Sequence, residues 1–419
     1  MTPPPSPSPA RRRVVIRGVG LVTPLGHGAW STFAALLRGR RITDRIDQLE
    51  PGTDPLPLSQ AVGGVSIARH TRIDPAVELA ERAAREAAAE ASTDLAGLPT
   101  WLGTSKGALH GLASAATRLH GPKPFAFPQP SLENLALGPH AYLDRHLAQR
   151  TGVDVPRHTV AACASSLTAL HQARLALLHA PDRPATAGLN RALVVTAEAA
   201  LLPALVHSYQ RLGVLAPLTL DGYRGQPLSA DRHGFVLAEV GAAVLLEAVE
   251  PGRPLPPGSI SLLDTAIATE AEDLIRPSDK MQALQYVADR LLAPRRIGVL
   301  HPHAPGTAQH DPRELEVLAR ALRLRGHTPP AVYAHKGALG HTLGSAGLVS
   351  LVLACLTART QKLPPMPWLD DHQAGSMPDA ALPVSARPTI DPQLKQEAHA
   401  IFAAGFGGHV AGAVIQNLP

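Results

Sequence analysis

Aromatic residues and cysteines are scarce in this chain of 419 residues. Tryptophan, tyrosine and phenylalanine together make up 3% of it, so the core has to be mainly aliphatic. Two cysteines, Cys163 and Cys355, are too few for a disulfide framework, which favours a reducing compartment, the cytoplasm. The formal net charge of +5 suits acidic partners, but few aromatic rings are available to stack on bases and no basic helix is apparent. Nucleic-acid binding is therefore not expected.

Long hydrophobic runs are also missing. No apolar run reaches the length of a membrane span, and the N-terminus lacks the hydrophobic segment of a secretory signal. Residues 1–12 are rich in proline, serine and arginine and are expected to form a disordered tail, with an organelle transit peptide as the alternative. We expect a cytoplasmic protein without a membrane span.

The most informative stretch is residues 159–178. A β-branched, apolar approach ends in small residues around Cys163, and leucines then recur along one side of a helical pattern. We expect Cys163 to lie where a buried strand turns into a helix. The free N–H groups and positive dipole at a helix start stabilise a thiolate and a developing oxyanion. The pattern predicts a nucleophile, and a buried cysteine that only fills space in the core is the alternative.

The rest of the chain alternates between strand and helix patterns, which is typical of an α/β protein. Strands are predicted at residues 191–198, 259–266, 297–300 and 410–415, and helices at residues 29–37, 74–92 and 281–292. A proline- and glycine-rich segment, 250–258, divides the pattern. On each side of it, small residues lead into an apolar helix, around Cys163 and at 337–356. We therefore predict a duplicated α/β fold with halves at residues 13–250 and 259–419.

Two stretches have a second interpretation. Gly18 and Gly20 follow the first predicted strand as in a dinucleotide-binding loop, but Thr23 stands where the third glycine of that motif belongs. We attribute these glycines to the close packing of a turn. Five prolines between residues 120 and 139 predict an ordered loop, of a kind that often lines a site or an interface.

Loop histidines in the second half carry the other chemical signals. His303 lies just after the carboxyl end of a predicted strand. Open α/β sheets usually bind ligands at the edge where the carboxyl ends of the strands lie. His341 lies at the start of an apolar helix, and a Gly-Phe-Gly-Gly motif occurs at residues 405–408. A cysteine, two histidines and a lysine at element ends suit an acyl-transfer site. A metal site of His301, His303 and His310 is the alternative, although its spacing matches no familiar zinc pattern.

A series of motifs along the chain occurs in an order and spacing that belong to one family. The motifs are residues 13–16, 18, 20, 23–24 and 26; 162–167; 230–232, 234–236 and 239; 303, 306–307, 311 and 314; 336, 340–341 and 343–347; and 405–408. Over nearly its whole length the sequence resembles the elongating, KAS I/II-like β-ketoacyl-[acyl-carrier-protein] synthases of the thiolase-like superfamily.

The resemblance implies a thiolase-like, duplicated αβαβα fold in five layers, assembled as a homodimer, with a heterodimer of paralogues as the alternative. It assigns catalysis to Cys163, His303, His341, Lys336 and Glu314, an oxyanion hole to the backbone N–H groups of Cys163 and Phe406, a gate to the Phe406 ring, and binding of the substrate arm to Thr307, Gly405 and Gly407. Lys336 is expected to pair with Glu314 and to organise the charge around the two histidines. No metal is implied.

The implied reaction is a decarboxylative Claisen condensation. Cys163 takes an acyl group from the phosphopantetheine arm of an acyl carrier protein, and a malonyl-type extender loses carbon dioxide and attacks that acyl group. Two neutral imidazoles suit this chemistry because they hold an oxygen without protonating the carbanion. No cofactor is implied beyond the arm, which arrives on the carrier protein, and the positive net charge suits an acidic carrier.

The chain also departs from the family pattern. Pro305 replaces one of two hydroxyl residues expected to hold the arm, and His409 and Val410 replace the residues that usually follow Gly-Phe-Gly-Gly. Ser229 stands where aspartate is common, and Lys106 interrupts a glycine-rich loop. These changes affect the expected binding of the phosphopantetheine arm and the expected substrate class. They leave the cysteine and the two histidines in place.

Three functions fit these motifs. The first is a ketosynthase of fatty-acid or, slightly favoured by the Ala-Ser-Ser-Leu run after the cysteine, polyketide-type biosynthesis. The second is a non-elongating partner subunit, like a chain-length factor, in a heterodimer. The third is an acyltransferase of the same fold that forms an ester or an amide. The sequence does not specify the acyl chain length, the starter unit or the extender.

Overall fold

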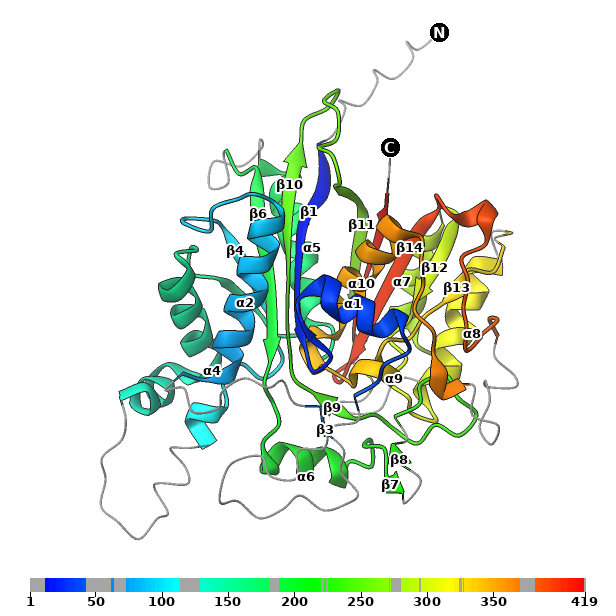
Figure 1. Ribbon diagram of the computed structural model, residues 1–419, viewed down its shortest axis with the longest axis horizontal. Helices are drawn as coiled ribbons and strands as arrows, with labels where there is room; N and C mark the ends of the chain where they lie inside the picture. Colours follow the sequence, from blue (N-terminus) through cyan, green and yellow to red (C-terminus); the bar gives the residue numbers. More distant parts are fainter. Residues whose placement is uncertain are drawn as a thin grey trace.

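The computed structural model describes residues 12–42, 62–63, 73–113, 129–180, 188–219, 222–223, 225–270, 272, 280–293, 295–323, 326, 328–369 and 381–417. Within them, one large mixed sheet runs through the molecule and helices cover it on both sides (Figure 1). Of the tail predicted at residues 1–12, only Arg12 is among the described residues, and it hydrogen-bonds to Glu250 at 2.6 Å. The remainder of that prediction lies outside the described residues.

The main sheet has the strand order β13-β12-β14-β15-β11-β1-β10-β6-β4-β5, and β2 pairs with β1 beside this path. Its strands are β1 (Arg13–Thr23), β2 (Gly26–His27), β4 (Thr100–Gly103), β5 (Arg157–Thr159), β6 (Arg191–Glu198), β10 (Val240–Val249), β11 (Ile260–Thr269), β12 (Ile297–His301), β13 (Ala331–Val332), β14 (Ala398–Gly405) and β15 (His409–Gln416). Two small ribbons lie apart from it, β3 (Val62–Gly63) with β9 (Leu237–Ala238), and β7 (Leu218–Thr219) with β8 (Gly222–Tyr223).

The order of the strands repeats on the two sides of the β1–β11 pair. On one side β5, β4 and β6 run parallel, and β10 and β1 follow antiparallel. On the other side β13, β12 and β14 run parallel, and β15 and β11 follow antiparallel. Among the described residues, the β1–β11 pairing that joins the halves consists of Val15 with Ser261 and Ile16 with Ile260. The predicted duplication is confirmed, while the exact limits of the halves, 13–250 and 259–419, stay predictions.

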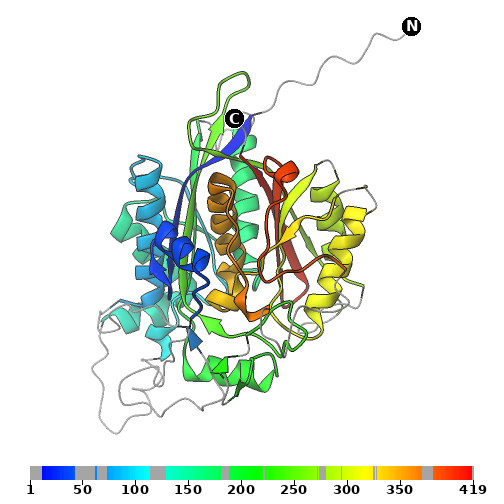
Figure 2. The ribbon, with the colours of Figure 1, turned by 45° about the vertical axis from the view of Figure 1, so that its right-hand side comes forward.

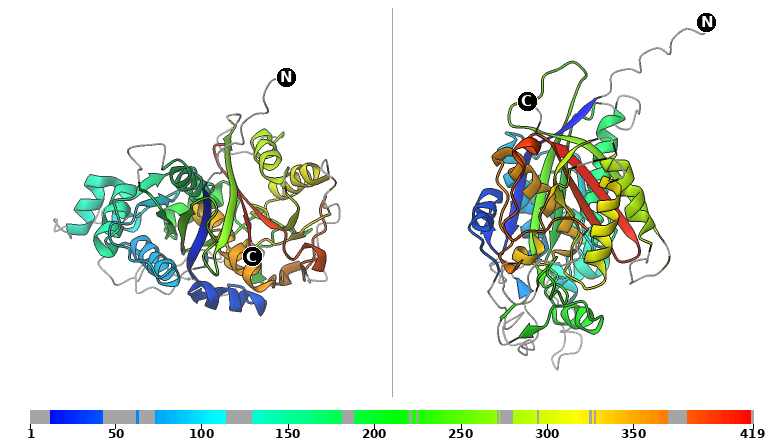
Figure 3. Two further views of the ribbon diagram at one scale, coloured as in Figure 1. Left: turned by 90° about the horizontal axis from the view of Figure 1, so that it is seen from above. Right: turned by 90° about the vertical axis from the view of Figure 1, so that its right-hand side faces the viewer.

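The helices give the fold its layers. They are α1 (Ala29–Leu37), α2 (Pro75–Glu90), α4 (Gln129–Thr151), α5 (Ser165–Leu178), α6 (Pro203–Arg211), α7 (Gln282–Leu292), α8 (His310–Arg323), α9 (Lys336–Leu339) and α10 (Ala346–Thr360), with short 3₁₀ turns η3 (Leu343–Ser345), η4 (Pro367–Leu369) and η5 (Pro392–Leu394). α2 packs on β1, β10 and β6, whereas α7 packs on β11 and β15 with α8 beside it. α5 and α10 contact strands of both halves, so they form the middle layer (Figures 2 and 3). The predicted five-layered α/β fold is confirmed.

The middle helix α10 is almost wholly buried, from Ala346 through Ala358. One segment, Leu343–Thr360, is long and apolar enough to cross a membrane, which corrects the expectation that no run reaches that length. However, 89% of this segment is buried inside the protein, where it separates the two halves of the sheet. Its apolar character is therefore explained by its place in the core.

Gly18 and Gly20 lie inside β1, which continues to Thr23, so the predicted glycine turn is wrong. A Cβ at Gly18 would come within 2.0 Å of the Ala87 carbonyl oxygen, and one at Gly20 within 2.0 Å of the Ala83 carbonyl oxygen. Both carbonyls belong to α2, which packs so closely on β1 that no side chain fits between them. Packing of this helix accounts for both glycines without a dinucleotide.

The proline-rich stretch differs from the sequence prediction in part. Residues 129–139, predicted as a loop, belong to α4, a helix that continues across a kink at Gly138, where φ is 76°. Pro139 follows directly, and a proline tolerates the start of a new helical segment because its missing N–H is not needed there. The prolines therefore interrupt a helix instead of excluding one. The part at residues 120–128 lies outside the described residues.

Candidate active site

Cys163 lies between β5 and the first turn of α5, at the predicted strand-to-helix junction. Ala162 before it has a φ of 47°, in the left-handed region that residues with a side chain rarely adopt. Ser165 Oγ holds this turn, since it donates to the Ala162 carbonyl at 2.6 Å and accepts from the Ala161 N–H at 2.8 Å. At the N-cap, Ala164 provides no side-chain hydrogen bond. Cys163 directly precedes this N-cap residue, so its backbone lies at the positive end of the α5 dipole.

Burial raises the pKa of the Cys163 thiol to about 12, although the Lys336 and Lys106 cations act in the opposite direction. The sequence suggested a thiolate stabilised by the helix end, but in the free protein the cost of burying a negative charge is larger. Cys163 is therefore a thiol at neutral pH. Its attack on a carbonyl carbon needs a group that accepts the proton.

His303 lies in the loop after β12, and its backbone is held from two directions. The Glu314 carboxylate of α8 accepts the N–H of His303 at 2.6 Å and that of Ala304 at 2.7 Å, and Lys336 Nζ donates to the His303 carbonyl. In the described part of the chain no ion pair joins Lys336 to Glu314, so the expected direct pairing is replaced by contacts through the His303 loop. Burial lowers the pKa of Lys336 to about 8, and the charge of Glu314 opposes this.

The rings of His303 and His341 are neighbours, with centroids 5.3 Å apart. Burial, followed by the Lys336 cation, holds the pKa of both imidazoles well below 6.5, so both are neutral at physiological pH. His341 Nδ1 accepts the Leu343 N–H at 3.0 Å, which leaves the proton of this neutral ring on Nε2. His303 Nδ1 is buried and has no hydrogen-bond partner among the described residues. His341 is thus a fixed donor, whereas the tautomer of His303 is free to change.

A cavity of about 510 Å³ brings residues of both halves together. The predicted site residues that line it are Cys163, His303, Thr307, His341, Gly405, Phe406 and Gly407, together with three positions that depart from the family pattern, Pro305, His409 and Val410. Lys336 and Glu314 do not line it and lie behind the His303 loop. The cavity therefore combines a nucleophile, Cys163, with a fixed hydrogen-bond donor, His341, and a neutral imidazole that can exchange a proton, His303.

The turn between β14 and β15 closes the cavity over Cys163. A Cβ at Gly405 would lie 2.7 Å from the Cys163 backbone nitrogen and 2.9 Å from the Ala162 Cβ, so only glycine fits there. The next residue, Phe406, is half-buried and packs in an apolar cluster with Phe235 and Leu343. The turn thus places the backbone of Gly405, the residue before Phe406, beside that of Cys163.

Tyr209 is a cavity residue that the sequence analysis missed. It lies on α6, which was not predicted, and its ring centroid is 6.0 Å from that of Phe235. Burial, and next the proximity of Cys163, raise the pKa of its phenol. A signal for this helix was present, because Pro203 follows Leu202, and Leu202, Val206 and Tyr209 recur at helical spacing.

The alternative of a metal site has no support in the geometry. His301 packs against the rings of Tyr333 and His399 instead of turning toward His303 and His310. Within the described ranges, no group of three or more His, Cys, Asp or Glu side chains could hold a metal ion.

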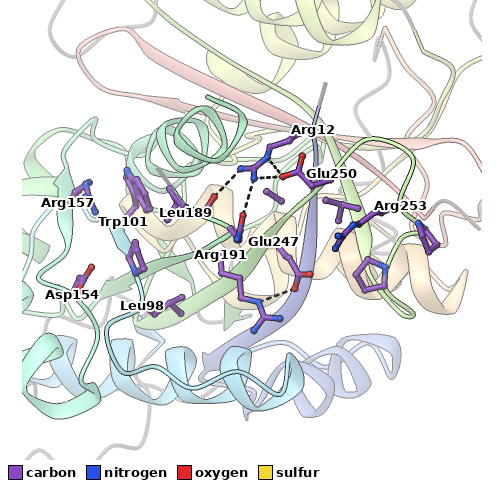
Figure 4. A pocket seen from close by; sticks show the side chains of 17 residues that line it. Arg12, Leu98, Trp101, Asp154, Arg157, Leu189, Arg191, Glu247, Glu250 and Arg253 are labelled. Atoms are coloured by element: carbon purple, nitrogen blue, oxygen red, sulfur yellow. Dashed lines mark hydrogen bonds and ion pairs between the residues drawn. The ribbon is translucent and has the colours of Figure 1, made fainter. Parts of the chain in front are cut away.

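A second, larger cavity of about 1070 Å³ lies near the end of β10 and the start of β1 (Figure 4). Two ion pairs lie in it: Arg12 hydrogen-bonds to Glu250 at 2.6 Å and also to Asn190 at 3.1 Å, and Arg191 pairs with Glu247 at 3.1 Å. None of the predicted site residues lines this space.

Two sequence models match most of the chain. The model described as "Beta-ketoacyl synthase, N-terminal domain" matches residues 11–251, and the one described as "Beta-ketoacyl synthase, C-terminal domain" matches residues 264–370. Among curated proteins, the chain is 24% identical to the 3-oxoacyl-[acyl-carrier-protein] synthase 2 of Mycobacterium leprae, over 94% of each chain. It is 25% identical to a putative polyketide beta-ketoacyl synthase 1 of Streptomyces halstedii, over 84% of this chain and 87% of the other.

Solved structures share the fold. A type II PKS acyl-carrier protein in complex with its ketosynthase, bound to the hexaketide, contains a chain that matches with a TM-score of 0.78 at 20% identity, over 97% of this chain and all of that one. The ishigamide ketosynthase/chain length factor matches with a TM-score of 0.78 at 22% identity, over 98% and 100% of the two chains. At these identities the likeness concerns the fold.

Proposed function

The chain belongs to the β-ketoacyl synthase family, and we propose that it joins an acyl group held on Cys163 to a malonyl-type extender in fatty-acid or polyketide biosynthesis. The observation that carries the proposal is the cavity in which Cys163, His303 and His341 meet. A non-elongating subunit would not need this set, and we do not favour that alternative.

The first half-reaction moves the acyl group. Cys163 Sγ forms a bond to the thioester carbonyl carbon of the acyl carrier protein, the bond from that carbon to the carrier sulfur breaks, and the Cys163 proton ends on the carrier thiol. With a thiol pKa of about 12, Cys163 needs a base. We assign this role to His303, because its ring is neutral and its Nδ1 is not committed to a partner. The N–H groups of Cys163 and Phe406 receive the developing oxyanion.

The second half-reaction forms the carbon–carbon bond. The malonyl-type unit loses carbon dioxide, and the electron pair of the broken bond passes into an enolate whose oxygen accepts hydrogen bonds from His303 and His341. The enolate carbon attacks the acyl group, the bond to Cys163 breaks, and the sulfur takes up a proton. His341 fits its part because its Nδ1 is occupied by the Leu343 N–H, so its Nε2–H remains a donor. A neutral donor stabilises the enolate without protonating its carbon.

The remaining assignments are proposals of the same kind. Thr307, Gly405 and Gly407 line the entrance that the phosphopantetheine arm would take, and no cofactor other than this arm is needed. The partner is an acyl carrier protein, to which the net charge of +5 is suited. We place the enzyme in the cytoplasm as a homodimer; a heterodimer is the alternative, and one structural neighbour is a ketosynthase/chain length factor.

Transfer of an acyl group to Cys163 is tested by intact mass spectrometry. The protein is incubated with carrier proteins charged with short to long acyl chains. We expect a mass increase equal to one acyl group, absent in Cys163→Ala and retained in Cys355→Ala, the matched control, since Cys355 is also buried but lies in α10 and not in the cavity.

Malonyl carrier protein is then added, and we expect carbon dioxide and a β-ketoacyl carrier product. If no acyl chain gives an adduct, Cys163 is not the nucleophile. If an adduct forms but is passed to an alcohol or amine without release of carbon dioxide, the protein is instead an acyltransferase that forms esters or amides.

A further inference from the structure

His310 is a third imidazole in the cavity, and no step of the proposed reaction uses it. It is the first residue of α8, and 8% of its surface is exposed. Its ring lies edge to face against that of His303, with centroids 5.3 Å apart and planes at 77°. His303 also contacts the His341 ring at 5.3 Å. His303 therefore has a further imidazole on the cavity wall in addition to its catalytic neighbour.

The Nε2 atom of His310 is buried and, within the described residues, has no hydrogen-bond partner. The Glu314 Oε2 atom lies 3.5 Å away and forms no hydrogen bond with Nε2, because this carboxylate is held on the backbone N–H groups of His303 and Ala304. The negative charge of Glu314 favours the tautomer that carries its proton on Nε2. A buried donor without an acceptor destabilises the free protein, so a ligand that brings an acceptor gains from binding there.

A malonyl-type extender brings such an acceptor. In the proposed function, on which this inference rests, its thioester oxygen lies between His303 and His341. One methylene carbon separates that carbonyl from the carboxylate, so the carboxylate oxygens fall next to an imidazole adjoining His303. The acyl donor of the first half-reaction has no carboxylate to place there. We propose that His310 is a specificity-determining residue of the extender step, whose Nε2–H binds the carboxylate of the malonyl-type unit beside His303.

The charges around His310 are compatible with this role. The Glu314 and Asp311 carboxylates both act on His310, and the Lys336 cation, which interacts with both and binds the His303 carbonyl, offsets their charge. A hydrogen bond from an imidazole orients the extender's carboxylate with less stabilisation than a fixed cation would give. This matters because strong binding of the carboxylate before the reaction would oppose its loss as carbon dioxide.

The two half-reactions separate this role from others. Acylation of Cys163 by acyl carrier protein and release of carbon dioxide from malonyl carrier protein are measured for the wild type, His310→Leu and His310→Gln, with Gln309→Ala as the control at the exposed mouth of the same cavity. For His310→Leu we expect kcat/KM of carbon dioxide release to fall about 10–100-fold, the usual effect of one hydrogen bond to a charged group, while acylation stays within about twofold. His310→Gln, which retains an N–H donor, should recover most of the loss.

Three results would overturn the inference: an equal fall in both half-reactions, no fall in His310→Leu, or no difference between Gln and Leu. Since a buried ring is changed, melting temperatures are compared first. If the variants do not fold, a crystal structure of the wild type with a malonyl-pantetheine amide decides: the carboxylate must lie within hydrogen-bond distance of His310 Nε2. A wild type that acylates Cys163 but never releases carbon dioxide contradicts the proposed function instead.

Discussion

The two cavities lie toward opposite ends of β10 and differ in how their polar groups are satisfied. In the larger one, about 1070 Å³, Arg12 binds Glu250 and Arg191 binds Glu247. In the smaller one, about 510 Å³, His303 Nδ1 and His310 Nε2 are buried without hydrogen-bond partners among the described residues. In the larger cavity these charged side chains are therefore paired within the protein, whereas in the smaller cavity two buried ring nitrogens are not hydrogen-bonded.

This difference indicates function better than volume does. Most buried polar atoms are paired, so an unpaired one that faces a cavity is a candidate contact for a ligand. Ion pairs at the rim of a cavity, in contrast, are common on protein surfaces and contribute little to the free energy of unfolding. We therefore expect substitutions in the smaller cavity to affect catalysis far more than stability. Substitutions in the larger cavity should change both catalysis and stability only a little.

The largest effect is expected from His341→Ala. This variant removes the donor whose tautomer is fixed by the Leu343 N–H, so the enolate loses one hydrogen bond. Loss of one such donor typically slows a reaction about 10²–10³-fold. We expect this fall in carbon dioxide release from malonyl carrier protein, with acylation of Cys163 nearly unchanged, as measured by mass spectrometry. His207→Ala, an exposed histidine on α6, is the control. A similar fall in acylation would mean that His341 acts in both half-reactions.

Gly405→Ala should have the next largest effect. Its Cβ would lie 2.7 Å from the Cys163 nitrogen, so the turn or the nucleophile has to shift. A displacement of about 1 Å at reacting groups can cost about 10²-fold in rate, so we expect the rate of acylation to fall by about that factor. Gly28→Ala is the control, as its Cβ would meet only the ends of the Glu86 and Ser31 side chains at 3.3 Å. Normal acylation in Gly405→Ala would show that the turn does not hold Cys163 in position.

Local sequence patterns predicted the elements that carry Cys163, His303 and His341. Their signals, small residues around a cysteine and a histidine directly after a strand, each lie within a few neighbouring residues. They missed what depends on contacts far apart in the chain. The unpaired Nε2 of His310 depends on where the His303 loop holds the Glu314 carboxylate, 3.5 Å from this atom and not hydrogen-bonded to it. The high pKa of the thiol likewise depends on burial between two halves of a sheet, and the helix start alone suggested the opposite direction.

A smaller effect is expected from pH. Lys336, with its pKa lowered to about 8, is a cation below that pH and neutral above it, and as a cation it lowers the pKa of Cys163. Alkylation of Cys163 by iodoacetamide should therefore be slower in Lys336→Met than in the wild type below pH 8. One pKa unit corresponds to a tenfold change in thiolate, so we expect a difference of up to about tenfold. The two rates should converge above pH 8. A constant ratio at all pH values would exclude the charge as the cause.

The smallest effects belong to the larger cavity, where Arg12→Ala, Glu250→Gln and the double variant form a thermodynamic cycle. Because the Glu250 side chain is 45% exposed, water already screens its charge, and the coupling free energy of unfolding should be no more than about 1 kcal/mol. Both half-reactions should stay at the wild-type rate. Slower acylation or carbon dioxide release in Glu250→Gln, at unchanged stability, would mean that this space also acts in catalysis, and that paired charges do not distinguish it from the site of Cys163.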